Sequence, residues 1–229
     1  MISFLISAIK IIFLLGFLIG IHETGHFLIA KLCKVRVNEF AIGFGPVIWK
    51  KQGKETKYEL RLIPLGGFVN MEGEAEQSEK EGSFTKASIP RRIAIVAAGA
   101  LVNIIFAIIV YFILAMTIRG DLTNAVVGNR VLDADNFVNR LYFASYNTKE
   151  FMLSIAESVK QLFTGKVSSA ELVGPVGISE VVAKTNGFRE FIYILAAISI
   201  SLGVTNLLPF PPLDGGKIVL ILLEAIRRK

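Results

Sequence analysis

The sequence has few of the residues that soluble and secreted proteins usually rely on. Its 229 residues include one cysteine, Cys33, and two histidines, His22 and His26. A single cysteine excludes a disulfide within the chain and any metal site built from several thiolates. Charged residues make up only 19% of the chain, whereas 53% of the residues are hydrophobic. This composition excludes an ordinary soluble domain and indicates a membrane protein.

Long apolar runs support that reading. They cover residues 2–30, 93–118 and 191–208, and a shorter run covers residues 218–226. About 20 apolar residues are needed to cross a bilayer. The first run is too long for a secretory signal and lacks a cleavage site of small residues. We therefore expect a mainly α membrane protein with three transmembrane helices and a partial fourth.

Both histidines lie inside the first apolar run, in the motif His22-Glu23-Thr24-Gly25-His26. Residues four apart share one face of a helix, so one Zn²⁺ can bind both imidazoles of this H-E-x-x-H pattern. Glu23 lies one residue around the helix, where it can take a proton from a metal-bound water. Ionisable groups are costly inside a membrane span. The motif therefore predicts a functional metal site within the membrane.

Two histidines do not complete a zinc site, and the third ligand must be a carboxylate or a thiolate. Asp214 is the strongest candidate, because it follows three prolines that end the third apolar run. A carboxylate in such an irregular segment beside the membrane must line a cavity or be paired. Glu224 and Glu180 are weaker candidates. Three protein ligands leave one position open, which is typical of a catalytic site with one zinc per chain.

The charges indicate how the chain is oriented. Residues 31–92 contain twelve Lys and Arg, and more follow the third apolar run. The positive-inside rule places both segments in the cytoplasm. Residues 119–190 contain eight basic and eight acidic residues, and we expect them outside. Topology thus accounts for the net charge of +6, and the absence of interleaved basic and aromatic residues argues against nucleic-acid binding.

Residues 35–71 are rich in β-forming residues separated by glycine turns, and they predict two hairpin-like strand pairs beside the first helix. Such an element is either a small cytoplasmic cap or a sheet edge that receives an unwound substrate strand. An edge is useful because the carbonyls of a helix are occupied by its own hydrogen bonds. The candidate substrate-strand residues are Gly66, Gly67 and Phe68.

Three further features stand apart from the metal motif. In the second apolar run, Gly99 predicts close helix packing, and the Asn103 amide either faces the active site or bonds a neighbouring helix. Residues 72–81 read as an acidic, solvated loop. Phe151–Phe163 has the periodicity of an amphipathic helix on the outer membrane surface or against the helix bundle.

Six motifs cover nearly the whole chain in a specific order. They are H-E-T-G-H at 22–26, F-A-I-G-F-G-P at 40–46, P-L-G-G-F-V at 64–69, G-A-L-V-N at 99–103, G-P-V-G-I at 174–178 and N-L-L-P-F-P-P-L-D-G-G at 206–216. They resemble the site-2 protease family of intramembrane zinc metalloproteases. The resemblance is strongest to the bacterial branch of regulated intramembrane proteolysis, which cuts anti-sigma factors and signal-peptide remnants.

The resemblance implies that His22, His26 and Asp214 bind zinc and that Glu23 is the general base. It also implies that Asn103 and Asn206 contact the substrate backbone or the oxyanion. The region 40–71 then corresponds to the membrane-associated β-element of the family, which favours the substrate-strand role over the cap.

The chain departs from the family pattern in two places. Residues 119–150 are fewer than the roughly 50 that a domain needs, so the PDZ domain of this branch is expected to be absent. The run 218–226 is too short to cross a membrane, so the last transmembrane helix is also expected to be absent. The expected segments are 1–32 (first helix), 33–91 (cytoplasmic β-element and acidic loop), 92–118 (second helix), 119–190 (extracytoplasmic segment) and 191–229 (third helix, L-D-G-G segment and shortened last helix).

The sequence as a whole predicts a multi-pass zinc endopeptidase of the bacterial inner membrane, with its active site towards the cytoplasm. Its expected substrates are transmembrane helices of single-span proteins. The alternative is a zinc-binding membrane protein without proteolytic activity, either a metal transporter or an inactive scaffold that sequesters substrates. Glu23 favours the protease, because a transporter needs no acid beside a histidine ligand.

Overall fold

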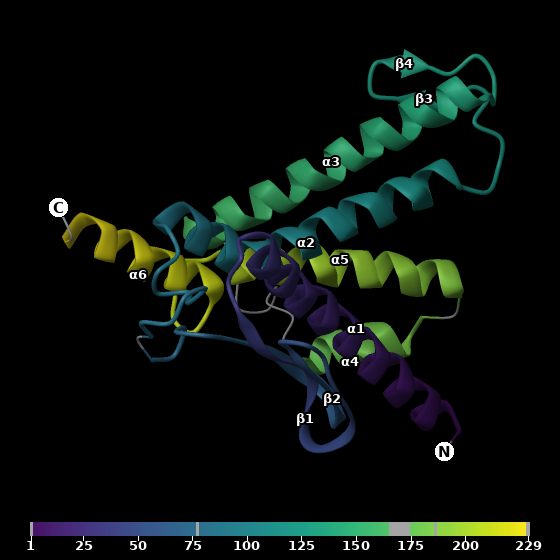
Figure 1. The fold of residues 1–229 in the computed structure, drawn as a ribbon. Helices are drawn as coiled ribbons and strands as arrows, with labels where there is room; N and C mark the ends of the chain where they lie inside the picture. The colour runs from purple at the N-terminus through teal and green to yellow at the C-terminus, as the bar shows by residue number, and fades with distance from the viewer. Residues whose placement is uncertain (1, 77, 165–174, 186, 228–229) are drawn as a thin grey trace. The chain divides into compact units, whose positions relative to one another are not determined.

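Figure 1 shows the computed structural model of the chain, which describes residues 2–76, 78–164, 175–185 and 187–227. The fold is mostly helical, with two small antiparallel sheets, β1–β2 and β3–β4. In chain order the elements are α1 (Ile2–Leu32), β1 (Val37–Gln52), β2 (Lys57–Met71), α2 (Ile89–Met116), β3 (Val126–Val127), β4 (Arg130–Val131), α3 (Phe137–Phe163), α4 (Pro175–Ala183), α5 (Phe188–Asn206) and α6 (Asp214–Arg227).

Three of the described helices are long and apolar enough to cross a membrane. The candidate spans are Leu5–Leu32, Ile89–Met116 and Phe188–Asn206. Their mean hydropathies are 2.3, 2.8 and 1.5, and the apolar residues of α1 are spread around the whole helix. A helix that is apolar on every side is typical of a membrane span. The three expected transmembrane helices are confirmed at this level of length and composition.

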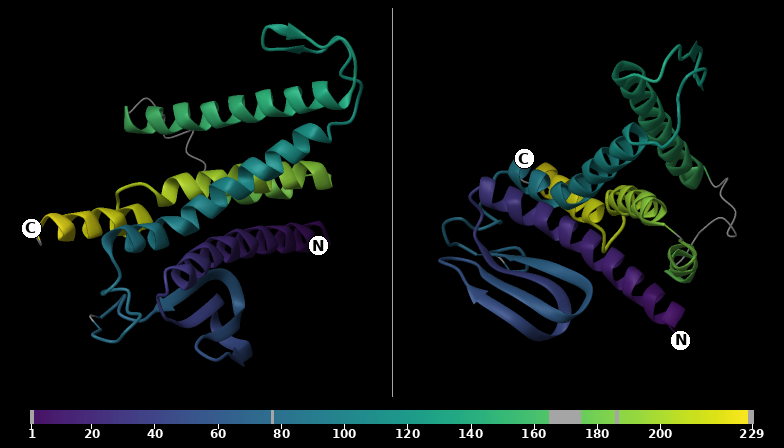
Figure 2. Two further views of the ribbon diagram at one scale, coloured as in Figure 1. Left: turned by 45° about the horizontal axis from the view of Figure 1, so that its top comes forward. Right: turned by 90° about the vertical axis from the view of Figure 1, so that its right-hand side faces the viewer.

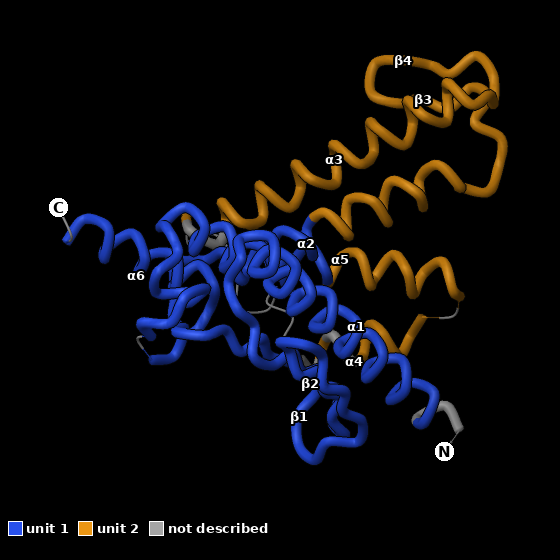
Figure 3. Tube along the Cα trace, viewed as in Figure 1, with its two compact units in different colours: residues 1–104, 199–229 blue, residues 105–198 orange. Residues whose placement is uncertain are grey.

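The chain divides into two compact units, residues 1–104 with 199–229 and residues 105–198 (Figure 3). In the second unit, Tyr111 of α2 stacks on Phe151 of α3 with ring centroids 4.1 Å apart. The amphipathic helix predicted over Phe151–Phe163 is the second half of α3, which begins earlier, at Phe137. Apart from the short β3–β4 hairpin, the described residues between α2 and α5 lie in helices and their connecting segments. Gly174 of the G-P-V-G-I motif lies outside the described residues.

In the first unit, small residues bring α2 very close to its neighbours. A Cβ added to Gly25 of α1 would lie 2.6 Å from the Ala98 carbonyl oxygen of α2. A Cβ added to Gly203 of α5 would lie 2.6 Å from the Ala100 carbonyl oxygen. Both distances are shorter than a carbon and an oxygen atom can approach without a steric clash, so only glycine fits at these two positions. Small residues at such crossings are how membrane helices pack closely, since lipid supplies no hydrophobic drive between them.

The sheet lies against α1, as Figure 2 shows. β1 and β2 pair antiparallel, but both strands bend strongly. Residues 39–42 of β1 are in register with residues 67–70 on one side and residues 57–60 on the other. The bend in β1 falls at Gly43 and Gly45, whose φ angles of +94° and +79° suit glycine. The two predicted hairpins are therefore one continuous, doubled-over pair of strands.

One buried cluster joins the elements of the first unit. It contains Ala30, Val35, Val37, Met71, Phe84, Ile95, Val96 and Ile221, which come from α1, both strands or the segments beside them, α2 and α6. Residues 207–213, which contain the three prolines, are irregular as predicted, and Asp214 is the first residue of the regular helix α6 that follows. The cluster therefore packs the first turns of α2, the sheet and α6 around the end of α1 that carries the H-E-x-x-H motif.

Candidate metal centre

The two histidines lie one turn apart on α1, and each is only 9% exposed. Their Nε2 atoms are 3.1 Å apart, and the rings meet edge to face with centroids 4.7 Å apart. His26 Nδ1 lies 2.8 Å from the backbone oxygen of Ile95 on α2. A neutral imidazole has one N–H, and donation of it to Ile95 leaves the Nε2 lone pair of His26 directed at the site.

Asp214 brings the third donor from the first residue of α6. Its Oδ2 lies 3.1 Å from His22 Nε2 and 3.4 Å from His26 Nε2, and the residue is 8% exposed. Burial raises the pKa of Asp214, but hydrogen bonds and attraction from the two histidines outweigh burial and hold the pKa well below its usual range. Asp214 therefore offers an ionised oxygen to the same point as the two ring nitrogens.

The spacing of these three atoms fits one zinc ion. Ligand atoms at 2.0–2.1 Å in a tetrahedral arrangement lie about 3.3 Å from one another. The three separations here are 3.1, 3.1 and 3.4 Å. Each nitrogen–oxygen contact in this buried cluster requires a shared proton or a metal ion, and one Zn²⁺ could serve all three donors. Neither weaker candidate belongs to this group of donors, and Glu224 pairs with Arg92 and Glu180 with Lys184 instead.

Gly99 of α2 forms the wall against the imidazoles. A Cβ at this position would lie 2.4 Å from His26 Nε2 and 2.8 Å from His22 Nε2. Real Cβ atoms do not approach that closely, so only glycine leaves room for both rings and an ion. The sequence predicted close helix packing at Gly99. Its contact with the two histidines depends on how α1 crosses α2, which no local pattern reveals.

Of the two asparagines predicted to serve the site, Asn103 lies beside it. Asn103 is fully buried, and its amide nitrogen is 3.5 Å from His22 Nδ1. Rotation of the amide by half a turn would present its oxygen to a His22 Nδ1–H, which leaves His22 Nε2 free for metal. Asn206, at the end of α5, is half-buried and does not line the pocket described next.

A pocket of about 210 Å³ opens onto the three donors. Its wall consists of His22, Glu23, His26, Gly67, Phe68, Val69, Met71, Glu74, Asp214 and Lys217. Strand β2 therefore passes directly by the motif, and a Cβ added to Gly67 would lie 2.9 Å from Glu23 Cγ. Gly67 and Phe68, two of the three substrate-strand candidates, line the pocket. Gly66 does not, and the Phe44 ring fills the space where its Cβ would be.

Sequence reasoning missed two charged residues at the same pocket. Lys217 of α6 donates to a Glu74 carboxylate oxygen at 3.0 Å. Burial lowers the pKa of Lys217, but the carboxylates of Glu74, Asp214 and Glu23 outweigh burial and raise it. Lys217 therefore stays positively charged beside the three candidate metal ligands. Its place one turn after Asp214 is the only sequence signal that could have found it.

Comparison with known proteins agrees with this geometry. Residues 10–229 match peptidase family M50. A Fusobacterium nucleatum protein named as a zinc metalloprotease is 30% identical, over 98% of this chain and 89% of that protein. A similarly named Clostridium acetobutylicum protein is 31% identical, over 93% and 86% of the two chains. The Regulator of sigma-E protease RseP of Escherichia coli is 43% identical, over 49% of this chain and 26% of RseP.

The alignment with the Fusobacterium protein extends over 306 residues, more than the 229 of this chain. That relative therefore carries residues without counterparts here. The family match covers almost the whole chain, including both halves of the cluster formed by His22, His26 and Asp214. The chain belongs to peptidase family M50, the site-2 protease family that its motifs resemble.

Proposed function

We propose that the chain is an intramembrane zinc endopeptidase that holds one Zn²⁺ through His22, His26 and Asp214. The observation that carries this proposal is the mutual spacing of the three donor atoms, which lie 3.1 to 3.4 Å apart inside an apolar helix bundle. Three protein ligands leave a position open for water, as catalytic rather than structural zinc sites do.

In this mechanism Glu23 is the general base. It lines the pocket beside both histidines, so it can take a proton from the attacking water and later give that proton to the leaving amine. Zinc, when bound, lowers the pKa of a water and polarises the scissile carbonyl. Asn103 holds His22, and Asn103 and Asn206 remain the candidates for contact with the substrate backbone or the oxyanion.

The substrate enters as an extended strand along the edge of β2. Residues 67–70 pair with β1 on one side, and Gly67 and Phe68 line the pocket. A strand added at this edge would receive the hydrogen bonds that its own helix gives up on unwinding. This arrangement suits single-span transmembrane segments, such as anti-sigma-factor-like proteins or signal-peptide remnants. It explains why a bent sheet lies beside the metal motif.

The bent end of the sheet associates with the membrane in this proposal. Apolar side chains of that region are 40–59% exposed, namely Phe44, Val47, Ile48, Trp49, Leu60, Leu62, Ile63 and Leu65. Leu220, Leu223 and Ile226 of α6 are also exposed, as a partial fourth span requires. The basic segments place residues 33–91 and the C-terminal residues in the cytoplasm, so the pocket faces the cytoplasmic side of the bacterial inner membrane.

Cleavage of a single-span helix in membranes tests the proposal. The chain, its Glu23→Gln variant and a control, Glu81→Gln in the exposed acidic loop, are each co-expressed with the substrate. Loss of a general base costs about 10²- to 10⁴-fold in rate. We expect Glu23→Gln to lose cleavage but keep zinc, a chelator to remove both, and Glu81→Gln to keep both.

Three results would contradict the proposal. Cleavage that survives both Glu23→Gln and the chelator would show a different catalytic centre. Stoichiometric zinc with no cleavage by the unaltered chain of any tested single-span helix would favour the inactive scaffold. Zinc-dependent metal flux in vesicles, without cleavage, would favour a transporter.

A further inference from the structure

Helix α6 presents one continuous face to the rest of the first unit. Asp214, Lys217, Ile221 and Glu224 follow a three-four-three spacing, so they line one side of the helix. Each of them has a contact there. Asp214 meets the histidines, Lys217 binds Glu74, Ile221 is 5% exposed in the buried cluster, and Glu224 binds Arg92.

Helix α2 carries a matching face. Arg92, Ile95 and Gly99 lie three and four residues apart, so they also share one side of their helix. Arg92 meets Glu224, Ile95 belongs to the same buried cluster as Ile221, and Gly99 faces the imidazoles that meet Asp214. The two helices are thus matched at three successive levels, with an ion pair at one end and the metal centre at the other.

The ion pair is well defined. Arg92 Nη1 donates to Glu224 Oε2 at 2.8 Å, and the two side chains are 11% and 31% exposed. The guanidinium also lies over the Phe84 ring, 5.1 Å from its centroid, and Phe84 is itself in the buried cluster. Charge, stacking and burial together hold Arg92 in one position. Apolar contacts of Ile221 alone would resist sliding of α6 much less, because hydrophobic burial is not directional.

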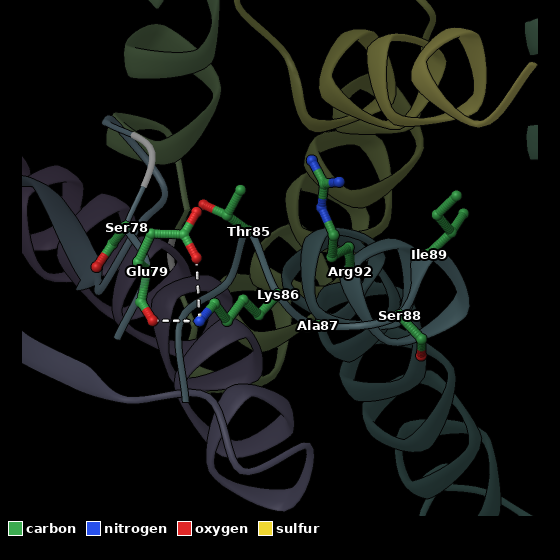
Figure 4. A pocket seen from close by; sticks show the side chains of 8 residues that line it. All are labelled: Ser78, Glu79, Thr85, Lys86, Ala87, Ser88, Ile89 and Arg92. Atoms are coloured by element: carbon green, nitrogen blue, oxygen red, sulfur yellow. Dashed lines mark hydrogen bonds and ion pairs between the residues drawn. The ribbon is translucent and has the colours of Figure 1, made fainter. Parts of the chain in front are cut away.

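Figure 4 shows the surroundings of Arg92 at the start of α2. Arg92 lines one side of a cavity of about 680 Å³, and the paired Lys86 and Glu79 line the other side. The cavity gives water access to the guanidinium when its partner is removed. Variants of this pair are therefore expected to fold, although loss of one partner from a buried ion pair is destabilising.

We propose that the Arg92–Glu224 ion pair is a positioning device that sets α6 against α2 and so holds Asp214 at the metal. Glu224 lies ten residues beyond Asp214, about 15 Å along the helix axis. An anchor at that distance determines both the direction of α6 and its register along α2. The inference rests on the proposed zinc site and assigns no contact between Arg92 or Glu224 and the ion itself.

The test measures zinc affinity of the purified, folded chain by competition with a chelator. The variants are Arg92→Gln, Glu224→Gln and the charge exchange Arg92→Glu with Glu224→Arg, with the exposed neighbouring Arg91→Gln as the matched control. Partners beyond the ligands typically change metal affinity 10- to 100-fold. We expect each single variant to weaken zinc binding about tenfold, the exchange to recover most of that loss, and Arg91→Gln to have no effect.

Absorption of the Co²⁺-loaded chain separates positioning from general stability, because the spectrum reports ligand geometry. We expect Arg92→Gln to change that spectrum, whereas a purely structural pair would lower the melting temperature and leave the spectrum unaltered. Arg92→Lys keeps the charge but not the planar fork, and it replaces Arg92→Gln if the latter does not fold. It should weaken zinc binding by less than tenfold.

Asp214→Asn in the same assay distinguishes the two proposals. Weakened binding by Asp214→Asn with unchanged affinity and spectrum in Arg92→Gln and Glu224→Gln would overturn only the positioning role. A charge exchange that binds zinc no better than the single variants would overturn it as well. Unchanged zinc affinity in Asp214→Asn would instead overturn the metal site on which the inference rests.

Discussion

The two halves of the candidate metal centre come together in different ways. His22 and His26 are neighbours on one helix, and four residues of regular α1 are enough to bring their Nε2 atoms within 3.1 Å. Asp214 is remote in sequence and depends on contacts of α6 with α2 and the sheet. The histidine pair is therefore preorganised by secondary structure, whereas the complete donor set requires tertiary packing.

Removal of the remote donor, Asp214, should reduce zinc affinity most strongly. We expect Asp214→Asn to weaken zinc binding by more than the roughly 100-fold that outer partners cause, because a charged ligand is lost. Helix content should stay unchanged, since α1 does not need Asp214 to form. Zinc competition and circular dichroism measure the two effects. Asp121→Asn, a carboxylate of the second unit, is the control, and an equal loss there would contradict the assignment.

A larger residue at position 99 should disturb the histidine pair, because Gly99 of α2 lies against both imidazoles. Gly99→Ala places a methyl group 2.4 Å from His26 Nε2, so the rings must move apart. We expect zinc affinity to fall at least about tenfold and the free energy of unfolding to drop by about 1–3 kcal/mol, as overpacking does. The measurements are zinc competition and thermal unfolding.

The control for Gly99→Ala is Gly187→Ala, because a Cβ at Gly187 has no atom within 4 Å among the described residues. This control should bind zinc as the unaltered chain does. Wild-type zinc affinity in Gly99→Ala would show that the imidazoles have more room than the structure gives them.

A smaller effect concerns pH and the sheet that frames the pocket. Hydrogen bonds from Lys57 and Arg61 lower the pKa of Glu59 to about 2, and bonds from Ser78 and Asn38 lower that of Glu72 to about 2. A carboxyl whose folded pKa is depressed stabilises the fold above its ordinary pKa of 4.5 and loses that contribution as pH falls towards 2.

Fluorescence of Trp49, the only tryptophan, reports on this sheet. We expect a constant signal from pH 7 to about 5 and a change between about 4.5 and 2. In Glu59→Gln that change should be smaller, because only Glu72 of the two carboxyl groups with a lowered pKa remains. A transition centred above pH 6 would contradict the assignment to these carboxylates.

Sequence reasoning succeeded where a pattern is local. The H-E-x-x-H spacing, the three apolar spans and the β-forming character of residues 35–71 all follow from periodicity and composition. The structure contains the helix, the spans and strands over residues 37–52 and 57–71. It failed where an outcome depends on a distant neighbour. The bent strands form one pair instead of two hairpins, and Gly99 lies directly against the two imidazoles. The charged pair Lys217–Glu74 was not foreseen at all.

The sequence alone indicates zinc-dependent hydrolysis within a membrane. Two histidines one helical turn apart with an adjacent glutamate, inside an apolar span, leave few other uses for these residues. The sequence also singled out Asp214 as the third candidate donor, but only packing brings its Oδ2 within 3.1 to 3.4 Å of both Nε2 atoms, because no local rule connects the ends of the chain. Close crossing at Gly25 and Gly99, burial of Ile221 and the Arg92–Glu224 pair bring α6 to the histidines. Those contacts arise from packing between distant segments, which local periodicity cannot specify.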